Sequence, residues 1–123
     1  WIRARSNAKG QLLVDRGNAG AETSISQRYT SAQSNTVLVS PTSVQTIHVT
    51  AMLFTLSNGA TQSPGALLKL GSTVIGDHPG IPAGGGYAWS DLDVSGAAGD
   101  NLTFSCDTPG GTISVTAHYW IDS

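Results

Sequence analysis

Turn-forming residues interrupt this chain so often that no helix of useful length fits between them. The effect is clearest in the final third, where the turn-rich segments 81–86, 96–101 and 108–111 bound apolar runs of only a few residues. Short alternating runs between Gly, Pro, Asn and Asp are typical of β-strands joined by turns. The chain therefore predicts an all-β fold, a jelly-roll-like two-sheet antiparallel sandwich with about eight strands in its main domain.

The N-terminal segment differs in pattern from the rest of the chain. Residues 2–5 and 11–14 flank a short turn that ends at Gly10, and this arrangement predicts a hairpin. Residues 15–22 have the composition of a linker. We therefore divide the chain into an N-terminal arm, residues 1–22, and a β-sandwich domain, residues 23–123. The first residue is Trp1 and not Met, which is consistent with a processed or truncated product.

The longest predicted strand runs over residues 44–57. Its alternation predicts one core face and one amphipathic face, since successive side chains of a strand point to opposite sides. The predicted core face carries Ile47, Val49, Ala51 and Leu53, and the amphipathic face carries Thr46, His48, Thr50, Met52 and Phe54.

Charge is scarce and unevenly placed. Charged residues make up 11% of the chain, which leaves little to oppose self-assembly or docking on a larger body. The basic residues among the first 28 positions predict a docking arm for an acidic partner surface. The alternative is a solvated terminus whose charges limit aggregation. A nucleic acid is a less suitable partner, because the basic residues are sparse and few aromatic residues lie among them. The basic residues are Arg3, Arg5, Lys9, Arg16 and Arg28.

The sequence predicts no catalytic residue, metal site or cofactor. Cys106 is the only cysteine, and alternation places it with Leu102 and Phe104, as a small buried hydrophobic side chain. No two histidines have a local ligand spacing, the glycine run 84–86 lacks the Lys of a phosphate loop, and no Gly-x-Ser-x-Gly motif is present. No apolar run approaches the length of about 20 residues that a membrane-spanning helix needs.

Aromatic residues are the remaining candidates for a binding role. Trp89 is expected in the core or in an interface. Tyr119 and Trp120 are adjacent in a predicted strand and must point to opposite faces, so at least one leaves the core and meets solvent, a sugar ring or a neighbouring subunit. Trp89, Tyr119 and Trp120 are therefore predicted glycan or subunit contacts.

Four segments together resemble a known family. They are residues 68–76 (LKLGSTVIG), 81–86 (IPAGGG), 96–102 (GAAGDNL) and 113–121 (ISVTAHYWI). In this order they resemble the small virion proteins of tailed bacteriophages, over roughly residues 44–121. Residues 8–14 (AKGQLLV) also resemble the opening of phage structural proteins.

The resemblance implies a non-enzymatic β-sandwich on the virion surface, either a capsid decoration or head-fibre protein. Its expected partners are the major capsid protein or a tail protein and further copies of itself, with a homotrimer favoured and the arm as anchor. The alternative is a carbohydrate-binding or host-adhesion module that recognises a host surface glycan through its aromatic side chains. The resemblance gives no role to Cys106 or to the histidines.

Overall fold

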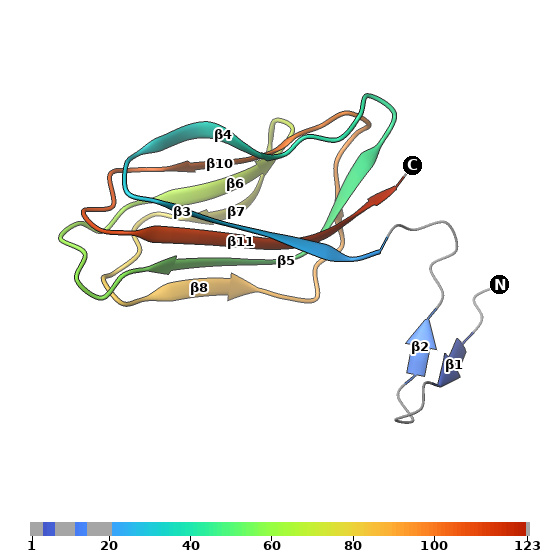
Figure 1. The fold of residues 1–123 in the computed structure, drawn as a ribbon, viewed down its shortest axis with the longest axis horizontal. Coiled ribbons are helices and arrows are strands. Elements are labelled where there is room, and N and C mark those ends of the chain that lie inside the picture. The colour runs from blue at the N-terminus through green and yellow to red at the C-terminus, as the bar shows by residue number, and fades with distance from the viewer. Residues whose placement is uncertain (1–3, 7–11, 15–20, 123) are drawn as a thin grey trace.

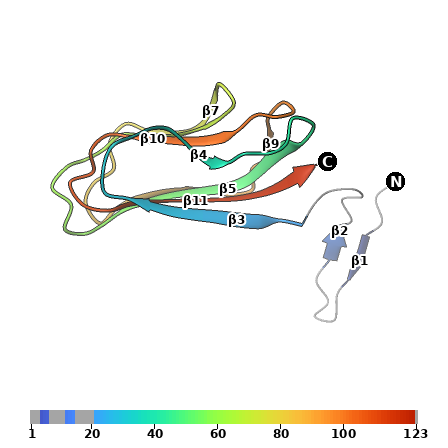
Figure 2. The same cartoon turned by 45° about the horizontal axis from the view of Figure 1, so that its top comes forward.

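The computed structural model of the chain describes residues 4–6, 12–14 and 21–122. It confirms the predicted all-β sandwich of two antiparallel sheets, which lie one above the other in Figure 2. One sheet has the strand order β3-β11-β5-β8, with β9 also paired to β5, and the other has the order β4-β10-β6-β7. The strands of the sandwich are β3 (Thr23–Tyr29), β4 (Gln33–Val39), β5 (Thr46–Leu56), β6 (Ala66–Leu70), β7 (Thr73–His78), β8 (Gly86–Trp89), β9 (Val94–Ser95), β10 (Leu102–Cys106) and β11 (Ile113–Asp122).

The chain passes repeatedly between the two layers, as Figure 1 shows. It crosses from β3 in the five-stranded sheet to β4 in the four-stranded sheet and returns to β5. The hairpin β6–β7 turns at Gly71, which has the positive φ of 63° that glycine tolerates, so the glycine between these two apolar runs marks their turn. β11 lies between β3 and β5, so it pairs on both sides with strands that come much earlier in the sequence.

The core lies between the sheets and follows the alternation of the inner strands. β6 and β10 each bury every second residue, and so does the first half of β11. Cys106 lies with Leu102 and Phe104 on the buried face of β10, as predicted. Aromatic rings fill the centre, where the ring centroids of Phe54 and Phe104 are 5.7 Å apart and those of Tyr29 and Phe104 are 5.6 Å apart.

The alternation predicted for β5 is correct in its first half and wrong in its second. Ile47 and Val49 are fully buried, but Leu53 is 39% exposed while Phe54 is fully buried. The reason is a β-bulge: Val49 pairs with Tyr119 and Ala51 pairs with His118, which leaves Thr50 without an opposite residue. One extra residue moves every later side chain to the other face of the sheet. Met52 and Phe54 therefore enter the core in place of the predicted Ala51 and Leu53.

Two other strands differ from their predicted limits. β4 begins at Gln33, although the apolar run that predicts a strand in this part of the sequence covers only residues 37–39. The additional residues are mostly polar because β4 is an edge strand with exposed positions, and such positions carry no apolar alternation. β9 covers only Val94–Ser95, whereas the apolar positions of residues 92–94 predict a strand that begins two residues earlier.

The predicted N-terminal hairpin is confirmed by strand pairing. β1 (Ala4–Ser6) and β2 (Leu12–Val14) are antiparallel neighbours with Arg5 opposite Leu13, and they form a two-stranded sheet of their own.

Deletion of residues 1–22 is expected to leave a folded sandwich. The buried hydrophobic side chains of the described residues all lie between Ile47 and Ala117, so the deletion removes none of them. Far-ultraviolet circular dichroism and thermal unfolding of the truncated chain test this expectation, with the full chain as control. Loss of the β-sheet spectrum would contradict the division into arm and body.

Candidate interaction surface

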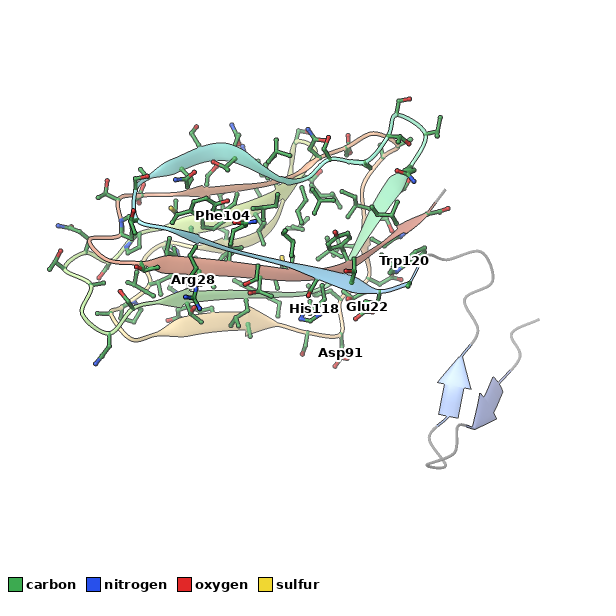
Figure 3. All side chains as sticks on the ribbon, in the orientation of Figure 1. Glu22, Arg28, Asp91, Phe104, His118 and Trp120 are labelled. Carbon is green, nitrogen blue, oxygen red and sulfur yellow. The ribbon has the colours of Figure 1, made fainter. Side chains whose placement is uncertain are left out.

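The side of the five-stranded sheet that faces away from the core is a surface rich in hydroxyl groups, which we call the outer face. Its side chains form rows across neighbouring strands: Arg28 lies beside Ser114, and Ser26 lies beside Thr116. The hydroxyl oxygens of Ser26 and Thr116 are 2.9 Å apart and share a hydrogen bond. Arg28 and His118 lie along this sheet in Figure 3. The outer face comprises Ser24, Ser26 and Arg28 of β3, Thr46, His48, Leu53 and Thr55 of β5, and Ser114, Thr116, His118, Trp120 and Asp122 of β11.

An aromatic cluster closes one end of the outer face. The imidazole of His48 stacks on the indole of Trp120, with ring centroids 3.7 Å apart and an angle of 4° between the planes. The His48 Nδ1 lies 2.6 Å from the Ser95 hydroxyl oxygen, and its Nε2 lies 3.5 Å from an Asp122 carboxylate oxygen. The cluster therefore joins β9, β5 and β11 through side chains as well as through the backbone.

Ser95, His48 and Asp122 are the residue types of a hydrolase triad, but their arrangement is that of a packed cluster. The indole of Trp120 covers one face of the imidazole. The buried Nε2 of His48 has no hydrogen-bond partner, and at 3.5 Å the Asp122 carboxylate is too far to orient the ring firmly. Ser95, His48 and Asp122 line neither the cavity around Asp77 nor the cavity around His118. The arrangement therefore fits side-chain packing at the end of the sheet.

The three aromatic residues predicted as contacts do not lie on one surface. Trp120 belongs to the outer face, whereas its neighbour Tyr119 packs against the core, as strand alternation requires. Trp89 is also partly buried against the core, and its ring meets Phe54 edge-on with centroids 5.4 Å apart. Trp120 alone of these three is placed for a contact through the outer face.

Tyr87 of β8 is an aromatic residue outside the three predicted contacts. The residue is 39% exposed, and its ring stacks on the imidazole of His78, with ring centroids 3.6 Å apart. This stack joins β8 of one sheet to β7 of the other, across the side of the sandwich where these two edge strands lie. The sequence could not predict this stack, because His78 lies in another strand of the other sheet.

Two cavities in the described part of the chain are lined by polar side chains. One, of about 310 Å³, is lined in part by Gln33, Asp77, His78, Ser105 and Asp107. Its polar groups are partly satisfied internally, since Asp107 accepts a hydrogen bond from the Gly65 backbone N–H at 3.1 Å.

The second cavity, of about 360 Å³, lies beside the bulge on the outer face and is lined by residues that include Glu22, Thr50, Ser90, Asp91 and His118. Within residues 21–122, no three His, Cys, Asp or Glu side chains gather closely enough to hold a metal ion.

The predicted basic docking arm is only partly visible. Arg3, Lys9 and Arg16 lie outside the described residues, and Arg5 is placed by its backbone pairing in β1. Arg28 lies in β3, where it is exposed on the outer face beside Ser114. Of the basic residues predicted to dock, Arg28 is therefore the one that the structure assigns to the sandwich surface.

Burial perturbs the titration of two side chains that pack in or against the core, Cys106 and Tyr29. Burial raises the pKa of the Cys106 thiol above its ordinary value of 9.0, and burial with the nearby Cys106 raises the pKa of Tyr29 above 10.0. The folded state therefore holds these protons more tightly than the unfolded state.

We expect the free energy of unfolding to be unaffected by these groups at neutral pH and to fall as pH rises above the ordinary thiol pKa. Urea unfolding between neutral pH and about pH 10 measures the slope. In the Cys106→Ala variant the slope is expected to be shallower. An equal slope in both proteins would exclude the thiol as a cause.

Comparisons with known proteins identify no family. No family model matches the chain, and no curated protein matches it. Among solved structures, it is similar to a chain from the infectious bursal disease virus Gt strain, with 13% identity, a TM-score of 0.44 and coverage of 98% of this chain. The chain spans 37% of the length of that viral chain.

A second similar structure comes from Bacillus endospore appendages, described as a novel family of disulfide-linked pili. The identity is 11% and the TM-score is 0.36, with coverage of 83% of this chain and 91% of the other. Neither likeness assigns a binding site or an activity to this chain. The structure itself contains, over its described residues, no helix long and apolar enough to cross a membrane.

Proposed function

We propose that this chain is a non-enzymatic structural protein whose sandwich assembles with other protein subunits on the surface of a virus particle. The observation that carries the proposal is the outer face, a sheet surface lined with Ser and Thr hydroxyls and few charges. Such a surface can form hydrogen bonds with a partner at a lower desolvation cost than a face of Lys and Glu would require.

The finer form of the proposal follows the sequence resemblance. The chain would be a capsid decoration or head-fibre protein of a tailed bacteriophage, bound to the major capsid protein or to a tail protein. A homotrimer remains the expected assembly. Many subunit contacts on one particle act at high effective concentration. Each contact can therefore have a low affinity while the assembled subunits remain firmly attached to the particle.

A carbohydrate-binding role is the second candidate, and one observation favours it. Trp120 lies on the same face as the cavity whose lining includes Asp91 and His118. Sugar rings stack on indole faces, and a carboxylate accepts hydrogen bonds from sugar hydroxyls. A host-adhesion module could use this combination.

Light scattering on the full chain, at several concentrations and at low and high salt, separates the two functions. Assemblies that grow with concentration support the structural role, because a surface built for subunits should pair in solution. A persistent monomer that binds sugars on a glycan array, and loses this binding on Trp120→Ala but not on Tyr87→Ala, would overturn the structural role in favour of adhesion. The control is matched because Tyr87 is also a partly exposed aromatic residue, on another side of the sandwich.

A further inference from the structure

Within the described part of the chain, β3 is an edge strand with one side open. Its hydrogen-bonded neighbour is β11, in an unbroken register from Thr23 opposite Tyr119 to Tyr29 opposite Ile113. The other edge strands of the described sandwich are interrupted or short: β4 and β7 have register shifts, and β8 has 4 residues. Bulges and short strands are common protections against edge-to-edge pairing, and β3 has neither of them, no Pro, and Arg28 as its single charged residue.

The hydrogen bonding inside the sheet shows which β3 groups point to the open edge. The N–H of Leu56 donates to the Gly85 carbonyl at 3.0 Å, on the β8 side of β5. The backbone of Leu56 therefore makes no hydrogen bond to its opposite residue Ile113. Because opposite residues of an antiparallel pair either exchange hydrogen bonds or both face away, the backbone N–H and C=O of Ile113 face β3. By the alternation of antiparallel ladders, odd-numbered β3 residues bond to β11, and the backbone groups of Ser24, Ser26 and Arg28 point outward.

We propose that β3 of one copy pairs antiparallel with β3 of a second copy, about a two-fold axis at Ser26. In this register Ser26 lies opposite Ser26 of the second copy, and Ser24 lies opposite Arg28. All three outward-facing residues of each strand then find partners, which gives about six backbone hydrogen bonds. The two five-stranded sheets become one continuous sheet across the axis.

The side chains of β3 fit this pairing. Arg28 faces the small Ser24 of the second copy, so the two guanidinium groups are kept apart. On the same face, Arg28 is diagonal to Glu22 of the second copy, a neighbour of opposite charge within reach of long side chains. The pairing is isologous, because each strand offers the other the same residues.

This contact goes beyond the proposed structural role and does not depend on a virus particle. If the chain also forms trimers, the two-fold contact would join a subunit of one trimer to a subunit of the next. A seven-residue strand pair is a small interface, so we expect a weak association that strengthens when many copies are held together.

A disulfide introduced at Ser26 tests both the contact and its register. Residues that exchange hydrogen bonds in an antiparallel pair have Cα atoms about 5.5 Å apart, which suits a disulfide. Under mild oxidation, the full-length Ser26→Cys variant is expected to form covalent dimers at least about tenfold faster than Ser24→Cys. In the Ser24→Cys control, the two introduced cysteines are four residues apart along the paired strands, roughly 13 Å, which is too far for a disulfide. Equal rates in the two variants would overturn the proposed register.

Proline at the same position tests the backbone contact. Because the Ser26 N–H points outward, Ser26→Pro removes an intermolecular donor and keeps the bonds to β11. Ser26→Ala loses the hydrogen bond to Thr116 but keeps the N–H, so it is the matched control. Light scattering should show weaker dimerisation for Ser26→Pro than for the parent chain, and unchanged dimerisation for Ser26→Ala. The β-sheet circular dichroism of both variants should be unchanged.

The outcomes separate this contact from the proposed function. If all variants assemble like the parent chain and Ser26→Cys forms no dimer, the β3 contact is wrong and the structural role stands. If the parent chain stays monomeric at all concentrations and Ser26→Cys forms no dimer, the β3 contact is wrong, and glycan binding then decides the function.

Discussion

Replacing Phe54 with alanine is expected to lower the free energy of unfolding by about 3–5 kcal/mol, the usual cost of removing a buried Phe ring. Phe54 is fully buried, and its ring contacts both Phe104 and Trp89. These three rings come from different strands, β5, β10 and β8, and belong to both sheets. The cavity left by the ring would lie between the layers, where backbone hydrogen bonding within each sheet limits collapse.

The neighbouring residue provides a matched control for this substitution. Leu53 is 39% exposed on the outer face, so Leu53→Ala is expected to cost less than about 1 kcal/mol. Urea unfolding of both variants gives the comparison. Simple alternation along β5 predicts the reverse order, and a larger loss for Leu53→Ala would contradict the bulge at Thr50.

Replacing Gly110 with alanine is expected to cost about 2–3 kcal/mol, from backbone strain and a steric clash together. Gly110 has a φ of 64°, in the left-handed region that other residues rarely occupy. An added Cβ would also contact the Thr61 hydroxyl and lie 2.9 Å from the Gln62 backbone nitrogen. The Thr61 N–H donates to the Gly110 carbonyl at 3.1 Å, so the loops before β6 and before β11 would have to separate.

Gly59→Ala is the control for the second substitution. An added Cβ at Gly59 meets no atom within 4 Å, and its φ is not in the left-handed region. Gly59→Ala should therefore change the melting temperature little, or raise it slightly by restricting the unfolded chain. Thermal unfolding of both variants tests the pair, and equal melting temperatures would exclude a strained turn at Gly110.

Local patterns in the sequence determined much of the fold. The strands around Phe104 and Val115 were predictable because their alternation is uninterrupted and each has a buried and a more exposed side. The turn at Gly71 was predictable because glycine tolerates its backbone conformation at no steric cost. The opposite directions of Tyr119 and Trp120 follow from the geometry of any strand. All these features depend on neighbours in the chain.

Tertiary structure alone decided the remaining features. The bulge at Thr50 exists only because β5 pairs with β11, a strand far away in the sequence. The stack of Trp120 on His48 likewise requires that pairing. The order of the strands left β3 at an open edge, with the N–H of Ser26 pointing outward. The sequence determined which segments become strands, because alternation acts between near neighbours, whereas the functional surfaces depend on which distant strands lie side by side.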